Sequence, residues 1–141
     1  MRINVTAALC LAKAFRQKNV STAGSSIVYL SSVMGIVGQS GQTAYSASKG
    51  ALVTLAKSLT LELSRENIRV NCVAPAVVNT EMSEKMFQSL TPEQVKQIES
   101  MHPLGIGTPR DVANAIAFLL ADTGRWITGT TLVVDGGYTA H

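Results

Sequence analysis

Short apolar runs alternate along this chain with longer stretches of helical periodicity, and this alternation is what most constrains the fold. Ile27 to Leu30 is a continuous apolar run with β-branched residues, and Ile68 to Ala74 and Thr131 to Val134 are predicted as further strands. A run that is apolar throughout suits a strand covered on both faces, as in a parallel sheet. The order helix, strand, helix, strand, helices, strand implies right-handed crossovers between parallel strands. We therefore predict an α/β fold with helices on both sides of the sheet.

Helical spacing and helix-start signals fill the segments between these strands. Apolar side chains recur at three- and four-residue intervals near the start of the chain, and again along a long helix from about Thr43 to Glu66. These positions are Val5, Ala8, Leu9, Ala12 and Phe15 in the first helix and Leu52, Leu55, Leu59 and Leu63 in the second. Thr91-Pro92-Glu93-Gln94 has a proline at the first helical position and a capping box, and Thr108-Pro109-Arg110-Asp111 resembles it. We expect the helix that begins after Thr108 to run to about Ala121.

The composition indicates one globular domain or one part of a domain. The chain has 141 residues, of which 46% are apolar and 15% charged, with a net charge of +3. Its lysines and arginines are scattered, which argues against a nucleic-acid surface, and no apolar run reaches the roughly 18 residues that span a membrane. Cys10 and Cys72 have no metal-ligand spacing, so we predict two buried thiols, no metal site and a cytoplasmic location. A signal peptide at the N-terminus is the alternative, but Arg2 alone is a thin positive region and the same residues have helical spacing.

Tyr45 and Lys49 are the residues most able to support acid–base chemistry. Four residues apart on a helix, their side chains lie on the same face one turn apart. A free phenol titrates near about pH 10 and is a poor proton donor or acceptor at neutral pH. A neighbouring ammonium favours the phenolate, so the pair can exchange a proton with an alcohol or carbonyl oxygen. On spacing alone, a packed tyrosine ring and a solvated lysine are the more common explanation of such a pair.

Polar residues at two strand ends support the catalytic interpretation. Ser31 and Ser32 follow the first strand directly, and the second strand ends at Ala74-Pro75, with Thr80 shortly after. Ligands of open α/β sheets bind at the carboxyl ends of strands, so these residues and the start of the long helix converge on one crevice. Ordinary turn chemistry is the alternative for the two serines.

These motifs together resemble the short-chain dehydrogenase/reductase family. The resemblance rests on Tyr45-Ser-Ala-Ser-Lys49, on a serine thirteen residues upstream of the tyrosine, and on Ile68-Arg-Val-Asn-Cys-Val-Ala-Pro75. It runs from about Ile3 to Tyr138 and is greatest to the 3-oxoacyl-acyl-carrier-protein reductase branch. It implies part of a doubly wound Rossmann-type sheet, with residues 1–141 forming the catalytic, C-terminal half of the domain.

The resemblance also implies a role for each matching residue. Tyr45 would be the catalytic acid/base, Lys49 would activate it and bind the nicotinamide ribose, and Ser32 would polarise the substrate oxygen. Asn4, which from the residues alone is a helix cap, would kink a helix and hold a water of the proton relay. The nicotinamide ring and carboxamide would meet three positions after the second strand: Pro75, Val78 and Thr80.

Cofactor, substrate and assembly follow from the same resemblance. The cofactor would be NAD or NADP, and the substrate a small-molecule or acyl-carrier-bound carbonyl. The segment from Glu81 to Gly107 would cover the substrate, where Met82, Met86, Phe87 and Met101 line a pocket or simply pack. In the family, the helix near Asn4 and the helix from Thr43 to Glu66 pack across an interface, which implies a homodimer or homotetramer.

The sequence departs from the family pattern in its phosphate-binding part. It contains no G-x-G-x-x-G; Gly105-Ile-Gly107 comes nearest, but Arg110 stands where the last glycine belongs. Ala76 also replaces a glycine that usually follows Pro75. We expect the run from Ile27 to Leu30 to leave an unpaired sheet edge, and the isolated chain to bind dinucleotide poorly and turn over slowly. A non-catalytic interaction module is therefore the alternative function.

A serine acyl-enzyme is a third hypothesis. Ser46-Ala-Ser-Lys49 matches the S-x-x-K motif of penicillin-recognising enzymes. The S-D-N and K-T-G motifs that accompany it are absent from the sequence, and the match overlaps the tyrosine–lysine pair.

Overall fold

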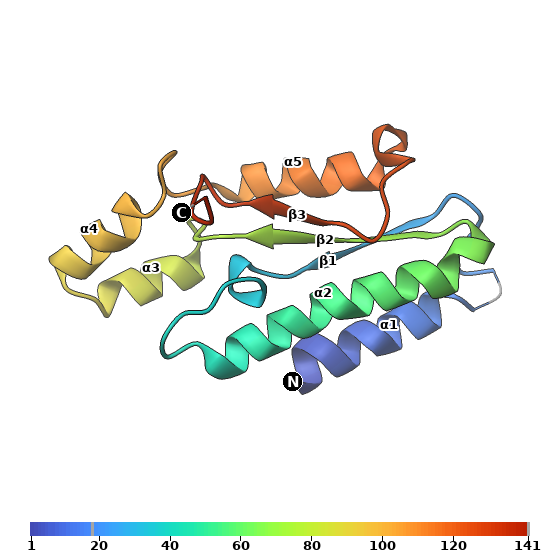
Figure 1. Ribbon diagram of the computed structural model, residues 1–141, viewed down its shortest axis with the longest axis horizontal. Helices are drawn as coiled ribbons and strands as arrows, with labels where there is room; N and C mark the ends of the chain where they lie inside the picture. The colour runs from blue at the N-terminus through green and yellow to red at the C-terminus, as the bar shows by residue number, and fades with distance from the viewer. Residues whose placement is uncertain (18, 141) are drawn as a thin grey trace.

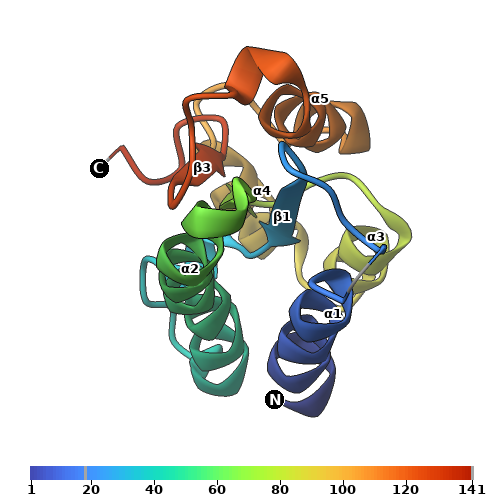
Figure 2. The same cartoon turned by 90° about the vertical axis from the view of Figure 1, so that its right-hand side faces the viewer.

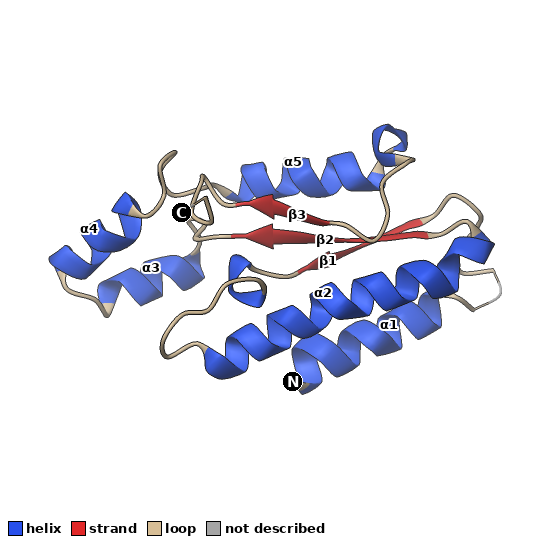
Figure 3. Ribbon diagram, viewed as in Figure 1, coloured by secondary structure: helices blue, strands red, loops and turns tan. Residues whose placement is uncertain are grey.

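A three-stranded parallel sheet forms the centre of the molecule (Figures 1 and 3). The computed structural model describes residues 1–17 and 19–140 of the chain. The strands lie side by side in the order β1 (Ser26–Leu30), β2 (Arg69–Pro75) and β3 (Thr131–Val134). Each begins and ends within one residue of the run predicted for it, and both pairings are parallel. The predicted α/β architecture is confirmed.

Helices cover both faces of the sheet and the space beyond its carboxyl ends. Figure 2 shows α1 and α2 against one face and α5 against the other, and in Figure 1 α3 and α4 lie past the strand tips. The helices are α1 (Ala7–Phe15), α2 (Thr43–Leu63), α3 (Glu81–Gln88), α4 (Pro92–Ser100) and α5 (Pro109–Leu120). Both predicted helix starts are confirmed, with Thr91 and Thr108 as the N-cap residues.

The leucine stripe of α2 forms the core on one side of the sheet. Leu52, Leu59 and Leu63 are buried and Leu55 packs partly against them, together with Cys72 of β2. Burying one such side chain contributes about 1.5–3 kcal/mol to stability, so the stripe fixes how the helix lies on the sheet. Because Tyr45 and Lys49 belong to the same helix, this packing also fixes their position over the strand ends.

A smaller core holds α5 on the opposite face. Val73 of β2 packs with Val112 and Leu119 of α5, all three of them buried. Asn71, fully buried on β2, ties the turn before β3 to the sheet: its Nδ2 donates to the Ile127 carbonyl at 2.9 Å. Its Oδ1 accepts from the Thr130 N–H at 3.1 Å. The central strand is thus fixed from both faces, which holds its carboxyl end in place.

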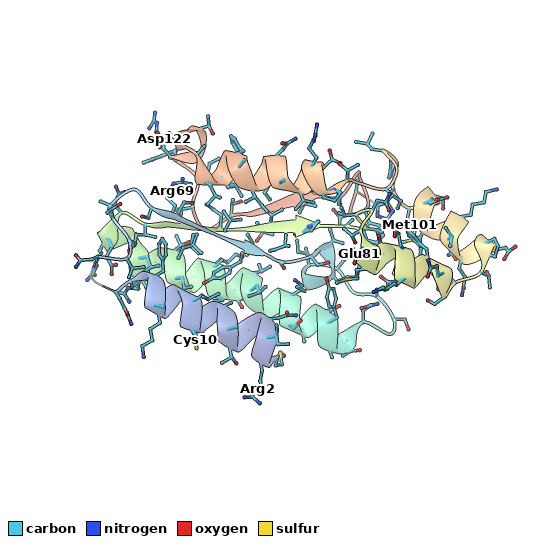
Figure 4. All side chains as sticks on the ribbon, turned by 180° about the vertical axis from the view of Figure 1, so that it is seen from behind. Arg2, Cys10, Arg69, Glu81, Met101 and Asp122 are labelled. Carbon is cyan, nitrogen blue, oxygen red and sulfur yellow. The ribbon has the colours of Figure 1, made fainter. Side chains whose placement is uncertain are left out.

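Three sequence-based expectations about the first helix are wrong. Cys10, expected in the core, is exposed on the outer side of α1 (Figure 4), whereas Cys72 is buried as predicted. Leu9, placed on the apolar face, is half exposed, because the face that meets the sheet is centred on Ala8 and Ala12. Asn4 is not a helix cap but lies inside a π-helical turn, Arg2–Thr6, that leads into α1.

Strand β1 is an edge of the sheet within the part of the chain that the structure describes. It pairs with β2 and with no other described strand, as expected, and Leu30 at its end is 49% exposed. Among residues 1–17 and 19–140, no helix combines the length and the apolar character needed to cross a bilayer.

Candidate active site

The ends of β1 and β2 are joined by two buried serines. The Ser31 N–H donates to the Val73 carbonyl at 2.8 Å, which continues the ladder one residue beyond β1. The Ser32 hydroxyl donates to the Pro75 carbonyl at 3.4 Å and accepts from the Met34 N–H at 3.2 Å. Ser32 therefore begins the 3₁₀ turn Val33–Gly35 and lies against the strand end that carries the other predicted residues.

Helix α2 is fastened to the end of β1 at Lys49. The Ser31 hydroxyl donates to the Lys49 carbonyl at 2.9 Å, and the Lys49 ammonium donates to the Leu30 carbonyl, also at 2.9 Å. Gly35 lies so close to the helix that a Cβ there would be 2.8 Å from the Gly50 nitrogen. Only glycine permits this backbone approach.

Tyr45 and Lys49 lie on the same face of α2, as their spacing predicts. The ammonium nitrogen is 5.7 Å from the centre of the tyrosine ring, within the range of a cation–π contact. Tyr45 is 42% exposed, so the residue is open to solvent on one side. Burial lowers the pKa of the Lys49 ammonium and raises the pKa of the nearby Cys72 thiol to about 11, which leaves Cys72 uncharged at neutral pH.

Asn4 contacts α2 from the start of the chain, 44 residues before Ser48. Its Nδ2 donates to the Ser48 hydroxyl oxygen at 3.0 Å, and that hydroxyl donates to the Tyr45 carbonyl at 2.8 Å. Because the only hydroxyl proton of Ser48 is used by this carbonyl, Ser48 must accept from Asn4. The amide orientation of Asn4 is thereby fixed, with Nδ2 toward α2. The π-helical turn around Asn4 is a distortion often found at functional sites.

The end of β2 and the loop after it carry the other three predicted residues. Pro75 contacts Ser32, as described above. Val78 forms a parallel bridge with Gly107, made by the Val77 carbonyl and the Asn79 N–H. In such a bridge the N–H and carbonyl of Val78 itself point away from Gly107. Thr80 is the N-cap of α3, where its hydroxyl accepts from the Ser83 N–H at 3.4 Å.

A groove of about 390 Å³ opens between the loop that leads into α2 and helix α4. Its walls combine amide and apolar side chains, which are Gln39, Gln94 and Gln97 and Leu90, Ile98 and Met101. Of the four residues expected at a substrate pocket, only Met101 lines this groove. Met82 is 79% exposed on α3 and points to solvent.

The acyl-enzyme hypothesis finds no support in the geometry. The Ser46 hydroxyl is buried and has no hydrogen-bond partner among the described residues, while the Lys49 ammonium is bound to Leu30. An activated serine needs its base within hydrogen-bond reach.

Three contributors to this site were not predicted from the sequence: Ser48, the pair Gly35 and Gly50, and His102. Ser48 lies inside the tyrosine–lysine motif, and this adjacency was the available signal. His102 is buried, and both of its ring nitrogens lie within hydrogen-bond distance of backbone groups. Nothing in its immediate sequence shows that.

The fold and the site define this chain as a Rossmann-type α/β protein. The sequence model of a family described as enoyl-(acyl carrier protein) reductase matches residues 1–139. The chain belongs to the short-chain dehydrogenase/reductase family.

Characterised relatives agree with this assignment. The chain is 41% identical over 138 residues to the 3-oxoacyl-[acyl-carrier-protein] reductase FabG of Haemophilus influenzae, a match that covers 97% of this chain and 55% of the relative. A short chain dehydrogenase family protein from Francisella tularensis superposes with a TM-score of 0.91 at 33% identity, over 99% of this chain and 60% of that one. A 4-hydroxyisoleucine dehydrogenase complexed with NADH gives a TM-score of 0.87 at 35% identity, covering 99% and 57%. The chain thus spans about half the length of the curated relatives it matches.

Proposed function

We propose that this chain carries the catalytic residues of an oxidoreductase that moves a hydride between NAD or NADP and a carbonyl or alcohol substrate. The observation that carries the proposal is the Lys49 ammonium held over the ring of a partly exposed Tyr45 at the ends of two parallel strands. Family membership and the NADH bound to a relative support it.

In this proposal Tyr45 exchanges a proton with the substrate oxygen. The Lys49 ammonium stabilises negative charge on the phenol oxygen, and the Leu30 carbonyl keeps that ammonium in place. Ser32 turns its hydroxyl from the Pro75 carbonyl to the substrate oxygen and polarises it. Asn4, with its amide fixed by Ser48, holds the water that returns the proton.

The donor set fits the nicotinamide end of a dinucleotide. An ammonium has three N–H donors, and Lys49 uses one for Leu30, so two can bind ribose hydroxyls. The backbone groups of Val78 point away from Gly107, and the Thr80 hydroxyl donates to the Val78 carbonyl at 3.4 Å. The Val78 N–H, and the Thr80 hydroxyl once it turns from that carbonyl, would hold the carboxamide. When bound, the nicotinamide supplies or accepts the hydride. The described residues contain no G-x-G-x-x-G turn between a strand and a helix for the pyrophosphate, so we assign them to the nicotinamide end only.

We propose an acyl-carrier-bound ketone as the substrate. The groove beside α4 joins an apolar wall to three glutamine side chains, which suits an acyl chain attached to an arm with amide groups. The relative named as a 3-oxoacyl-[acyl-carrier-protein] reductase supports this choice over other small alcohols and ketones. We further propose a homodimer or homotetramer in the cytoplasm, a location supported by two free cysteines.

Binding of the nicotinamide end can be tested without turnover. Reduced nicotinamide mononucleotide, titrated into the protein, is expected to shift the amide NMR signals of Val78 and Thr80, and to do so less in Lys49→Met. Unchanged spectra at millimolar concentrations would refute the cofactor assignment.

Chemistry is tested with an acetoacetyl thioester and NADH or NADPH, by the loss of absorbance at 340 nm. Tyr45→Phe is expected to lower kcat by about 10²- to 10⁴-fold, the usual contribution of general acid catalysis. Tyr29→Phe is the matched control, since the Tyr29 hydroxyl binds only the Ala8 carbonyl among its described contacts. Equal rates in the two variants would contradict the mechanism. A protein that binds partners but reduces no ketone would favour an interaction module instead.

A further inference from the structure

A buried histidine outside the proposed catalytic set connects three separate segments. His102 follows α4 and is 3% exposed. Its Nδ1 lies 2.7 Å from the Ile98 carbonyl, and its Nε2 lies 3.4 Å from the Val77 nitrogen. Its ring also packs on Tyr138, with ring centres 5.0 Å apart.

The two hydrogen bonds determine which ring nitrogen carries the hydrogen. A carbonyl can only accept, so Nδ1 must donate to Ile98. A backbone N–H can only donate, so Nε2 must be the bare acceptor for Val77. The neutral Nδ1–H form of His102 is the one that satisfies both partners; a hydrogen on Nε2 would face the Val77 N–H and break that bond.

The segments joined by this ring belong to two different parts of the proposed site. Ile98 and Tyr138 line the groove beside α4. Val77 begins the stretch that contains Val78 and Thr80, and its carbonyl is held by the Gly107 N–H at 3.2 Å. His102 thus holds the Val77 N–H while Gly107 holds the carbonyl, which leaves this peptide little freedom.

We propose that His102 is a positioning residue that sets the nicotinamide loop, residues 76–80, against the wall of the substrate groove. This role rests on the proposed function, but the contacts that carry it do not involve the cofactor.

Two amide substitutions test the hydrogen bonds of the two ring nitrogens one at a time. His102→Asn can still donate to the Ile98 carbonyl but is too short to reach Val77. His102→Gln can place an amide oxygen near the Nε2 position and accept from Val77. His102→Phe keeps a ring against Tyr138 and makes neither bond.

The readout is amide hydrogen exchange at Val77, measured by NMR without cofactor. Exchange is expected to be about five- to tenfold faster than wild type in the Asn and Phe variants and within about threefold of wild type in Gln. The Cys72 amide of β2, which lies outside this loop and donates to the Thr130 carbonyl at 2.9 Å, is the internal reference and should stay protected while the fold is intact. Equal Val77 exchange in the Asn and Gln variants, or ring nitrogen shifts that place the hydrogen on Nε2, would overturn the proposal.

Kinetics then distinguish this role from a purely structural one. His102→Asn should raise the KM for NADH or NADPH several-fold with a smaller change in kcat, and His102→Gln should restore it. A structural defect would lower the amount of active enzyme and leave KM unchanged. If the exchange pattern holds but no variant or wild type reduces a ketone, the proposed function fails while the positioning of the loop stands.

Discussion

The contact between Gly35 and α2 leads to a prediction about stability. Gly35→Ala would place a methyl group 2.8 Å from the Gly50 nitrogen and 2.8 Å from the Lys49 carbonyl carbon. Both are backbone atoms, so no side-chain rotation can relieve the overlap, and either the turn or the helix must move by about half an ångström to restore ordinary contact. That movement also stretches the hydrogen bond from the Ser31 hydroxyl to the Lys49 carbonyl.

The magnitude follows from the cost of overpacking. Forcing one extra methyl group into a closely packed site typically costs about 1–3 kcal/mol. With a urea m-value of about 2 kcal/mol/M, a loss of ~2 kcal/mol in the free energy of unfolding lowers the unfolding midpoint by about 1 M. Because the clash is with a helix that carries Tyr45 and Lys49, catalysis should fall as well.

Urea unfolding followed by far-ultraviolet circular dichroism is the assay, since Trp126 is 92% exposed and reports little by fluorescence. Gly38→Ala is the matched control: it lies in the same loop, and a Cβ there would meet no atom within 4 Å. Gly38→Ala should leave stability unchanged or raise it by about 0.4–1 kcal/mol, because alanine restricts the unfolded chain. Equal midpoints for the two variants would show that the close approach does not exist in solution.

Two further predictions concern other contacts. Asp135 accepts from the Gly137 N–H and from the N–H and hydroxyl of Thr139; burial acts to raise its pKa, but these hydrogen bonds outweigh burial and lower it. Its contribution to stability is therefore present above about pH 4 and is lost as the pH falls through the lowered pKa. Urea midpoints of Asp135→Asn and wild type should differ at pH 7 and converge as the pH falls through that lowered pKa; a gap independent of pH would contradict this. For the Asn4–Ser48 hydrogen bond, a double-mutant cycle with both residues changed to alanine should give a coupling of about 0.5–1.5 kcal/mol in urea unfolding, whereas additive effects would mean that the bond contributes nothing.

The elements of the fold could be predicted because each is encoded by local pattern. The run from Ile27 to Leu30, the leucines of α2 and the cap at Thr91 are signals within a few residues of one another, and all are confirmed. The expectations that proved wrong concerned which face of helix α1 is buried against the sheet. Cys10 and Leu9 lie beside the buried stripe of α1, and only tertiary packing decides which side of a helix meets the sheet.

The residues of the candidate site likewise fall into those that local spacing predicts and those that only contacts between distant segments bring together. The spacing of Tyr45 and Lys49 determines that they share a helix face. The position of Ser32 directly after a strand determines that it lies at the carboxyl end of the sheet. Contacts between distant segments have no local signal: Asn4 meets Ser48 from 44 residues away. His102 accepts a hydrogen bond from Val77, 25 residues away, and no local pattern in the sequence predicts this contact.

The way Lys49 is held explains why this site depends on backbone packing. Its carbonyl accepts from Ser31, its ammonium donates to Leu30, and the next residue contacts Gly35, so three points of one short segment fix it. A charge held in this way does not need to reorganise when negative charge develops on a neighbouring oxygen, and such preorganised groups account for much of the rate enhancement of enzymes. In the proposed mechanism, the ammonium is fixed by a strand carbonyl and not by the phenol hydroxyl of Tyr45, so that hydroxyl can face the substrate while the positive charge stays in place. The electrostatic effect of Lys49 therefore depends on the geometry of the segment after β1, which is why a single methyl group at position 35 should disturb both stability and catalysis.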